Sequence, residues 1–512
     1  MTASKQLKIG AILSYLSIAV NIFAGLIYTP WMVNQIGKSH YGLYTLANSL
    51  ISLFLVDFGL SSATARFVSK YRAEGDQNKI DNFLGVIYKL YLAIDAIIFI
   101  ILLVVFFLID KIYVNLTPQE IYEFKIVYLI AGSFAVFNFP FVTQNGILTA
   151  YEKFVSVKLA DIIYRFLLVG LTVLVLVLGY GLYALVTVHA VAGISIIIFK
   201  FIILKKTVPA KVNFRYSDNS LYKEIFGFSI WVTVELLAQR LIFNITPTIL
   251  GITVDSSAIA IFGVISVVEG YAYIITTAIN GMFMPKISKD FVAAGNGDMV
   301  AFGKRVQPLF LKVGKFQFAI NGLIIAGFAI VGKNFIDLWM GAGYSQAALG
   351  ILLVTIPGLF FNSLQIANTA LVVVNKVRLK AIVMVITGVI NVVFSFIFSL
   401  IYGVIGACAS IFIAYIIRAI LINVIANNVL KLDIKSFFKS CYLRMSIPLL
   451  LTIIVGLLMS YFIGQAGWLM FFIKAIIIAV AYLCFVYLLG INNEERKFAI
   501  YKIKQLFKRK GN

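Results

Sequence analysis

Residues 41–76 read YGLYTLANSLISLFLVDFGLSSATARFVSKYRAEGD. Sixteen mostly apolar residues without a charge lead into Asp57-Phe58-Gly59, and the chain then turns basic at Arg66. Asp-Phe-Gly is the magnesium-holding motif of protein kinases, but no Gly-rich loop or catalytic His-Arg-Asp sequence accompanies it here. An uncharged run that ends in basic residues is instead typical of the inner end of a membrane-spanning helix.

The composition of the whole chain agrees with that interpretation. Of its 512 residues 62% are hydrophobic and only 12% are charged, whereas soluble domains carry about 25% charged residues. Apolar runs of about 20 residues, enough to cross a bilayer, follow one another from end to end. The sequence therefore predicts an all-α polytopic membrane protein, and its net charge of +22 indicates contact with anionic membrane lipids rather than with nucleic acid.

Breaks at Gly, Pro, Asn and charged residues divide the chain into fourteen predicted transmembrane helices. They cover residues 11–34, 40–63, 83–108, 122–150, 155–178, 181–204, 224–250, 257–285, 308–331, 345–374, 381–401, 404–426, 445–463 and 469–489. With the N-terminus in the cytoplasm, the inner segments hold 31 of the 43 Lys and Arg residues. Basic residues collect in cytoplasmic loops, so this asymmetry predicts that both termini are cytoplasmic.

An internal repeat of six helices recurs at an offset near 220 residues. TPWMV at Thr29 matches TPTIL at Thr246, and SKYRAEGD at Ser69 matches SKDFVAAGNGD at Ser288. An even number of helices gives both halves the same orientation, which is typical of transporters that hold substrate between two bundles. We expect an N-lobe over residues 1–222, a C-lobe over 223–430, and two further helices with a basic tail over 431–512.

Three arginines lie deep inside predicted helices, where an ionisable residue usually faces a cavity or a partner. Arg240 follows Glu235 by five residues, which places the two side chains on different faces of the helix. Arg165 follows Asp161 by four residues, so an intrahelical ion pair is an alternative to a role in a cavity. Arg418 lies about eight residues from the inner helix end and could partly reach the interface. All three are candidate cavity residues.

Carboxylates inside the spans are the candidates for ion coupling: Asp57, Asp95, Glu235 and Glu269. The predicted helix 257–285 also carries a polar stripe at three- and four-residue steps, which is typical of a cavity wall: Ser266, Glu269, Tyr273, Thr276 and Asn280. No His/Cys cluster, phosphate-binding Gly-rich loop or activated nucleophile is present. We therefore expect no metal, no cofactor and no enzymatic reaction.

The motifs YGLY at Tyr41, DFGLSSATARFVSKY and RAEGD resemble the Wzx-type polysaccharide flippases of the multidrug/oligosaccharidyl-lipid/polysaccharide exporter superfamily. Span count, six-helix repeat and two additional C-terminal helices match that family over the whole chain. The resemblance implies movement of a polyprenyl-pyrophosphate-linked oligosaccharide from the inner to the outer leaflet of the bacterial cytoplasmic membrane. We expect the protein to act as a monomer and its driving force to come from an H⁺ or Na⁺ gradient.

A pyrophosphate that crosses a membrane needs cationic partners, and the planar fork of Arg binds phosphate oxygens in pairs. Arg66 lies at the inner mouth of its helix, where such a group would meet the protein, although ordinary positive-inside anchoring explains it equally well. For ion coupling Glu269 and Glu235 are the first candidates. The first helix departs from two related groups, because it has neither the arginines of lipid II flippases nor the coupling carboxylate of many drug exporters.

Three other functions remain open at the level of the sequence. A drug exporter of the same superfamily would have an apolar, aromatic cavity dominated by acids. A polysaccharide polymerase or ligase would need a sizeable outer loop, and the predicted outer connections are short. A scaffold that recruits glycosyltransferases through its basic inner loops is the third alternative.

Overall fold

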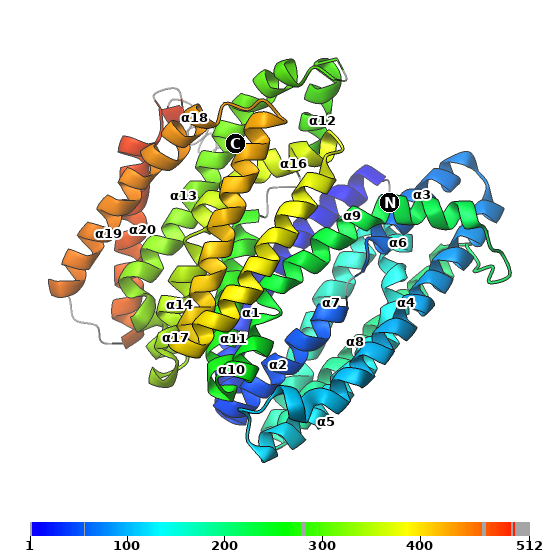
Figure 1. The fold of residues 1–512 in the computed structure, drawn as a ribbon, viewed down its shortest axis with the longest axis horizontal. Coiled ribbons are helices and arrows are strands. Elements are labelled where there is room, and N and C mark those ends of the chain that lie inside the picture. The colour runs from blue at the N-terminus through cyan, green and yellow to red at the C-terminus, as the bar shows by residue number, and fades with distance from the viewer. Residues whose placement is uncertain are drawn as a thin grey trace, which may run out of the picture. The chain divides into compact units, whose positions relative to one another are not determined.

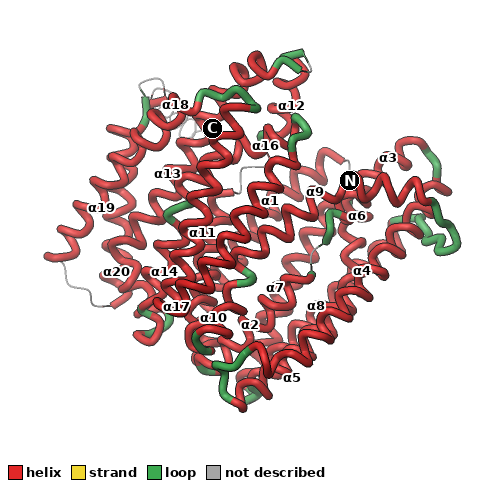
Figure 2. Tube along the Cα trace, in the orientation of Figure 1, coloured by secondary structure: helices red, strands yellow, loops and turns green. Residues whose placement is uncertain are grey.

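The computed structural model describes residues 3–55, 57–277, 282–295, 297–462, 467–492 and 495–496. Helices dominate these ranges, and no β-strand occurs within them (Figure 2). The all-α class predicted from the apolar runs is therefore confirmed. Eleven helical segments in the described ranges are long and apolar enough to cross a membrane.

Close packing groups the helices into two compact units, and the first comprises Met1–Val264 and Met384–Ser410. Within it α1 lies beside α7, α2 beside α5, and α3 beside α6 (Figure 1). Its helices are α1 Ala3–Ile36, α2 Lys38–Phe54, α3 Leu60–Glu74, α4 Gln77–Ile112, α5 Pro118–Asn138, α6 Thr143–Ala150, α7 Phe154–Val177, α8 Leu182–Thr207, α9 Asn219–Phe243 and α10 Thr246–Thr253. The 3-10 turn Phe139–Val142 joins α5 to α6.

The second unit comprises Ile265–Val383 and Ile411–Asn512. Its helices are α12 Met284–Ala293, α13 Met299–Trp339, α14 Gln346–Thr355, α15 Gly358–Phe361, α16 Gln365–Val373, α18 Ile434–Phe437, α19 Arg444–Phe462 and α20 Gly467–Phe485. Helix α13 packs against α14, α19 and α20. Two long helices contribute residues to both units: α11 Ser256–Thr277 and α17 Val377–Asn428. The lobes 1–222 and 223–430 stay a prediction.

The predicted continuous helix 40–63 is wrong at the Asp-Phe-Gly motif, where the chain leaves the helical conformation. Helix α2 ends at Phe54 and α3 begins at Leu60, with φ of 54° at Phe58 and 68° at Gly59. This left-handed backbone breaks the ladder of helical hydrogen bonds. Asp57 then compensates for the break, because its carboxylate accepts the N–H of Ser61 at 3.2 Å.

A second break lies inside α17, where Gly403 has φ 57° and ψ −136°. This combination is accessible almost only to glycine. The sequence predicts two helices here, 381–401 and 404–426, and the position of the turn between them is confirmed by this kink. The two halves continue as one helical element of 52 residues.

Side chains at the loops define several helix starts. Asp76 accepts the backbone N–H of Lys79 at 3.0 Å at the start of α4, and this hydrogen bond holds the pKa of the Asp76 carboxyl below its usual value. At the start of α5, Thr117 and Glu120 form a capping box around Pro118. Such caps satisfy N–H groups that have no partner within the helix.

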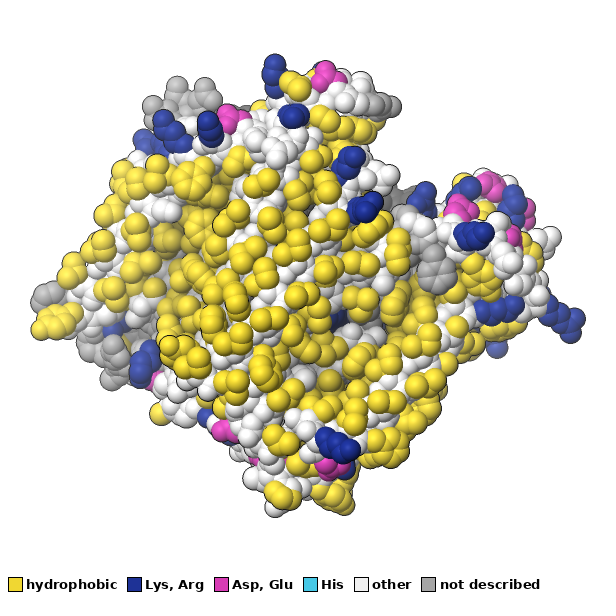
Figure 3. Space-filling model, in the orientation of Figure 1, with side chains coloured by type: hydrophobic (Ala, Val, Ile, Leu, Met, Phe, Trp, Pro, Cys, Tyr) yellow, Lys and Arg dark blue, Asp and Glu magenta, His cyan; other side chains and the backbone are white. Residues whose placement is uncertain are grey.

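The outer surface of the helices is apolar. Ile27, Phe107 and Leu469 are exposed by 76%, 68% and 76%. Such side chains on a soluble protein would promote aggregation, whereas a lipid bilayer solvates them. In Figure 3 hydrophobic side chains cover the visible face of α17 and α19, and Lys and Arg gather beside α18. The surface is therefore that of a multi-pass membrane protein.

Candidate functional site

A small polar cavity lies inside the second unit. Glu269 and Tyr273 reach it from α11, Asn321 from α13, Asn362 from the turn after α15, and Tyr415 from α17. Its volume is about 20 Å³, which is about the space that one water molecule needs. Two members of the predicted polar stripe, Glu269 and Tyr273, thus share one cavity.

Two buried amides connect three helical elements beside Glu269. The Oδ1 atom of Asn321 accepts hydrogen bonds from Thr276 Oγ1 and from Asn362 Nδ2, both at 3.3 Å. The amide nitrogen of Asn321 donates to the backbone oxygen of Gln317 at 2.8 Å. Buried polar groups are stable only when they are paired, so this network connects α11 to α13 and to the turn after α15 beside the cavity.

Arg418 is completely buried, with 0% of its surface exposed. Its guanidinium carbon lies 4.6 Å from the ring centre of Tyr415 and 5.1 Å from that of Phe361. Both rings also line the cavity that contains Glu269. The negative ring faces attract the cation and offset part of the free energy lost when the guanidinium leaves water. The same two aromatic rings therefore contact a buried cation and line a cavity that contains a carboxylate.

The cavity offers a carboxylate, amides and phenols, which suit a proton, a small cation or hydrogen-bonding groups rather than covalent chemistry. Within the described ranges no group of three or more His, Cys, Asp or Glu side chains comes together. The described part of the structure therefore gives no set of ligands for a transition metal.

Arg165 in α7 makes a different contact from the intrahelical ion pair considered above. Asp161 pairs with Lys158, with 3.3 Å between Oδ2 and Nζ. The Nη2 atom of Arg165 donates to the backbone oxygen of Asn21 in α1 at 3.4 Å. Arg165 therefore connects two helices of the first unit.

Arg240 belongs to a polar chain across α9 and α2. Its Nη1 atom lies 3.4 Å from Asn244 Oδ1, and Asn244 Nδ2 donates to Ser52 Oγ at 2.6 Å. Glu235 lies half-buried on the same helix, α9. Arg165 and Arg240 both belong to the first unit, so the structure does not collect the three predicted arginines within one unit.

The remaining predicted residues are dispersed. The Asp57 carboxylate accepts the hydroxyl of Tyr91 at 2.6 Å, and Oδ1 of Asp95 in α4 is buried without a hydrogen-bond partner among the described residues. Arg66 is exposed on α3, with its guanidinium 5.9 Å from the ring centre of Phe67. Asn280 lies outside the described residues.

Uncharged amides are the functional candidates that the sequence did not single out. Asn321 and Asn362 complete the Glu269 cavity. A second cavity of about 220 Å³ in the first unit is lined by Gln144, Asn145 and Lys200, among others. A search for amides inside apolar spans, in addition to charged residues, would have found all four of these amides.

Comparison with known proteins gives a family and a fold. A family model described as polysaccharide biosynthesis protein matches residues 7–289. A solved structure of the lipid II flippase MurJ in an inward closed conformation is 16% identical, covers 94% of this chain and 98% of its own, and superposes with a TM-score of 0.70. No curated protein sequence matches the chain.

Two further transporter structures are similar as well. An inward-facing multidrug resistance MATE family transporter of the MOP superfamily is 14% identical, covers 84% of this chain and all of its own, and has a TM-score of 0.64. A MOP superfamily transporter from Pyrococcus furiosus, with 14% identity, covers 82% of this chain and 93% of its own at a TM-score of 0.58. At these identities the likeness shows the fold alone.

Proposed function

The chain belongs to the family of polysaccharide biosynthesis proteins, and on that premise we propose that it is a flippase for a polyprenyl-pyrophosphate-linked oligosaccharide. It moves this glycolipid from the inner to the outer leaflet of the bacterial cytoplasmic membrane by alternating access, as a monomer. The observation that carries the proposal is the buried Arg418 beside the Glu269 cavity in a membrane-embedded protein of this family. A buried cation and a part-buried carboxylate inside a membrane are costly, and transport of a charged substrate driven by an ion gradient uses both.

Fourteen spans with both termini cytoplasmic belong to this proposal. The eleven apolar helical segments include α17 as a single segment, although Gly403 divides it into two halves. The proposed fourteen spans are these eleven with α17 counted as two, together with α1 and the α2–α3 pair, which are not among the eleven. The basic segments between the helices then lie on one side, as expected for cytoplasmic loops.

The arginines have distinct roles in this mechanism. Arg66, exposed on α3, meets the pyrophosphate at the cytoplasmic mouth. Arg165, Arg240 and Arg418 lower the cost of carrying its negative charge through the membrane. A helix–helix hydrogen bond such as that from Arg165 to the Asn21 oxygen also allows an arginine to exchange one partner for another as helices move.

Coupling to H⁺ or Na⁺ is assigned first to Glu269, with Glu235, Asp57 and Asp95 as further acids on the path. Glu269 shares its cavity with Tyr273 and two amides, so a proton or small cation would find oxygen partners there. Asn280 continues the same polar stripe by sequence. Binding of the ion at Glu269 would change the net charge near Arg418. The free energy of binding a negatively charged substrate there would change with it.

The leaflet in which lipid-linked oligosaccharide accumulates tests the proposal. Cells that lack the gene should accumulate it in the inner leaflet, and Glu269→Gln at normal abundance should reproduce that phenotype. Accumulation in the outer leaflet would identify a polymerase or ligase instead. If no glycolipid accumulated while drug sensitivity rose, the chain would be a drug exporter.

Arg66→Ala tests the role of the cytoplasmic mouth. Glycolipid export should fall at normal protein level because the pyrophosphate loses a charged partner at the surface. Lys376→Ala, an exposed basic change in another inner segment, serves as the control and should leave export unchanged. If both changes lowered export equally, Arg66 would act only as one of the basic residues that orient the protein in the membrane.

A further inference from the structure

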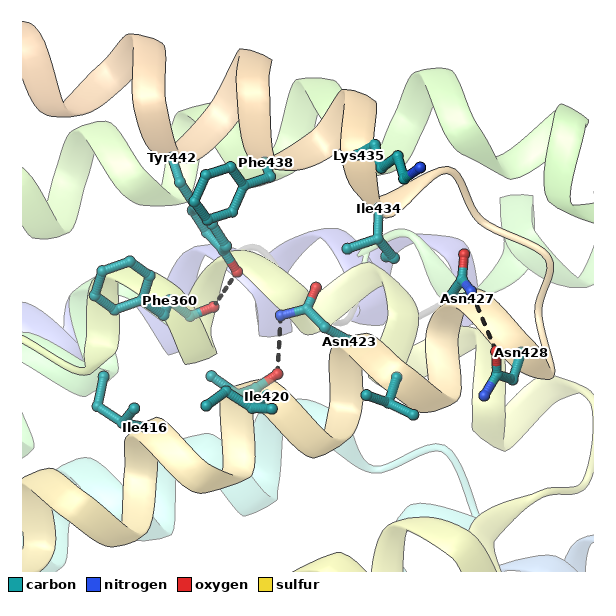
Figure 4. A pocket seen from close by; sticks show the side chains of 12 residues that line it. Phe360, Ile416, Ile420, Asn423, Asn427, Asn428, Ile434, Lys435, Phe438 and Tyr442 are labelled. Atoms are coloured by element: carbon teal, nitrogen blue, oxygen red, sulfur yellow. Dashed lines mark hydrogen bonds between the residues drawn. The ribbon is translucent and has the colours of Figure 1, made fainter.

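An open groove of about 800 Å³ lies on the second unit between α17 and the segment that connects it to α19. Figure 4 shows Phe360 and Ile416 towards one end of this groove and Asn427, Asn428 and Lys435 towards the other. Its volume is in the range of sites that enclose a ligand of several hundred daltons. It is separate from the Glu269 cavity, with which it shares no lining residue.

The walls of the groove are apolar along most of its length. Ile420 and Phe438 are exposed by 56% and 55%, and the small side chain of Ala419 is buried at the base. The hydroxyl of Tyr442 donates to the backbone oxygen of Phe360 at 3.0 Å, so the polar end of this residue is already satisfied. A π-helical turn, Phe438–Leu443, forms one rim, and such turns are frequent at functional sites.

The other end of the groove is polar and basic. The amide nitrogen of Asn423 donates to the backbone oxygen of Ala419 at 2.8 Å, and that of Asn427 donates to Asn428 Oδ1 at 3.2 Å. A side-chain amide has two N–H donors, so each of these nitrogens keeps a second N–H for a ligand. Lys435 is exposed, and it takes part in none of the ion pairs within the described ranges. Lys431 and Lys439 flank it in the sequence and are also exposed. Amide donors and an ammonium group therefore lie where the apolar groove opens.

We propose that this groove binds one anionic phospholipid, with an acyl chain along α17 and the phosphate at Lys435 and the asparagine amides. A phosphodiester carries a single negative charge, which one lysine and neutral amides match. The pyrophosphate of a lipid-linked glycan would require several cations in direct contact, and Lys435 is the one charged side chain among the lining residues. Basic pockets between transmembrane helices are known to hold anionic head groups.

Such a lipid would bridge α17 and the connecting segment Ile434–Leu443. A ligand that binds only the folded protein stabilises it by RT ln(1 + [L]/Kd), where [L] is the free ligand concentration. The bound lipid thereby fixes the angle between α17 and α19 at the basic side of the membrane. This role is independent of the identity of the transported substrate.

Native mass spectrometry of the purified full-length protein, delipidated and then titrated with phosphatidylglycerol, tests the proposal. We expect one phosphatidylglycerol to be retained, phosphatidylcholine to be lost, and Lys435→Gln to weaken retention about fivefold, as expected for one basic residue at an anionic head group. Lys376→Gln, which removes an exposed lysine outside the groove, should retain the lipid like the natural protein.

Equal retention of the two phospholipids, or equal weakening by both lysine changes, would overturn the proposal. So would retention of a polyprenyl phosphate probe with loss of phosphatidylglycerol, since the groove would then belong to the carrier lipid. Thermal unfolding in phosphatidylglycerol or phosphatidylcholine nanodiscs gives a second readout. The natural protein and Lys376→Gln should have a higher Tm in phosphatidylglycerol, and Lys435→Gln should lose most of that increase. None of these measurements depends on transport.

Discussion

At the scale of single residues, Asp57 shows how one side chain repairs a break that the chain itself creates. The backbone leaves the helix at Phe58 and Gly59, and the Asp57 carboxylate then accepts both the Ser61 N–H and the Tyr91 hydroxyl. The kinase-like motif of the sequence is thus a helix start. Asp57 could couple transport to an ion only if its carboxylate exchanged the Ser61 N–H and the Tyr91 hydroxyl for that ion.

Asp57→Ala should destabilise the protein by about 1–3 kcal/mol, because it removes two hydrogen bonds to a charged group. Tyr91→Phe removes one of them and should cost less. The two substitutions should not be additive, because they share one interaction. Thermal unfolding of the two variants and their double variant in detergent measures this coupling, and strict additivity would show that the Tyr91 contact contributes nothing.

Arg418 gives a second prediction at this scale. Arg418→Lys keeps the charge but loses the planar group that stacks on Tyr415 and Phe361, so stability should fall by ~1–2 kcal/mol. Arg305 is exposed on α13, and Arg305→Lys provides the matched control. A lower apparent Tm for the first variant alone is expected. Equal Tm values would mean that the rings do not stabilise the guanidinium.

At the scale of elements, three helical segments are interrupted at special positions. The 3-10 turn with Pro140 interrupts the span that contains α5 and α6, Phe58 and Gly59 separate α2 from α3, and Gly403 bends α17. Proline removes a hydrogen-bond donor and glycine permits a positive φ. These local rules account for the breaks at Pro140 and Gly403, whereas Phe58 has a positive φ although it is not glycine.

Gly403→Ala should lower stability by about 1–3 kcal/mol, because a Cβ is strained at φ 57° and ψ −136°. No neighbouring atom would clash with it, so backbone strain is the only cost. Gly170 lies within α7 and also has open space around it. Gly170→Ala should therefore be neutral or slightly stabilising. If both changes had the same effect on apparent Tm, the conformation at Gly403 would not be strained.

At the scale of the whole molecule, the orientation in the membrane can be checked with single cysteines in a background in which Cys408, Cys441 and Cys484 are Ala. Val114, between α4 and α5, is 68% exposed, and Lys376 precedes α17. A membrane-impermeant maleimide should label Val114→Cys in intact cells and Lys376→Cys only after permeabilisation. The reverse pattern would invert the proposed topology and place both termini outside.

The sequence by itself determined the helical class, the membrane environment and the family. These properties depend on composition, on the length of apolar runs and on local motifs, all of which can be read along the chain. Most predicted spans also coincide with observed helices, because hydrogen-bonding of the backbone in lipid leaves few other choices. The break at Asp57 was missed because the surrounding residues are apolar enough to continue a helix.

Only the tertiary structure decided which polar residues meet. It joined Glu269 and Tyr273 to Asn321 and Asn362, which are separated along the chain, and it placed Arg418 on two aromatic rings. It also showed that Asp161 forms an ion pair with Lys158 rather than with Arg165. Helical spacing shows which side chains share a face of one helix. The residues that this face contacts depend on how helices from distant parts of the sequence pack, and a single sequence does not show that packing.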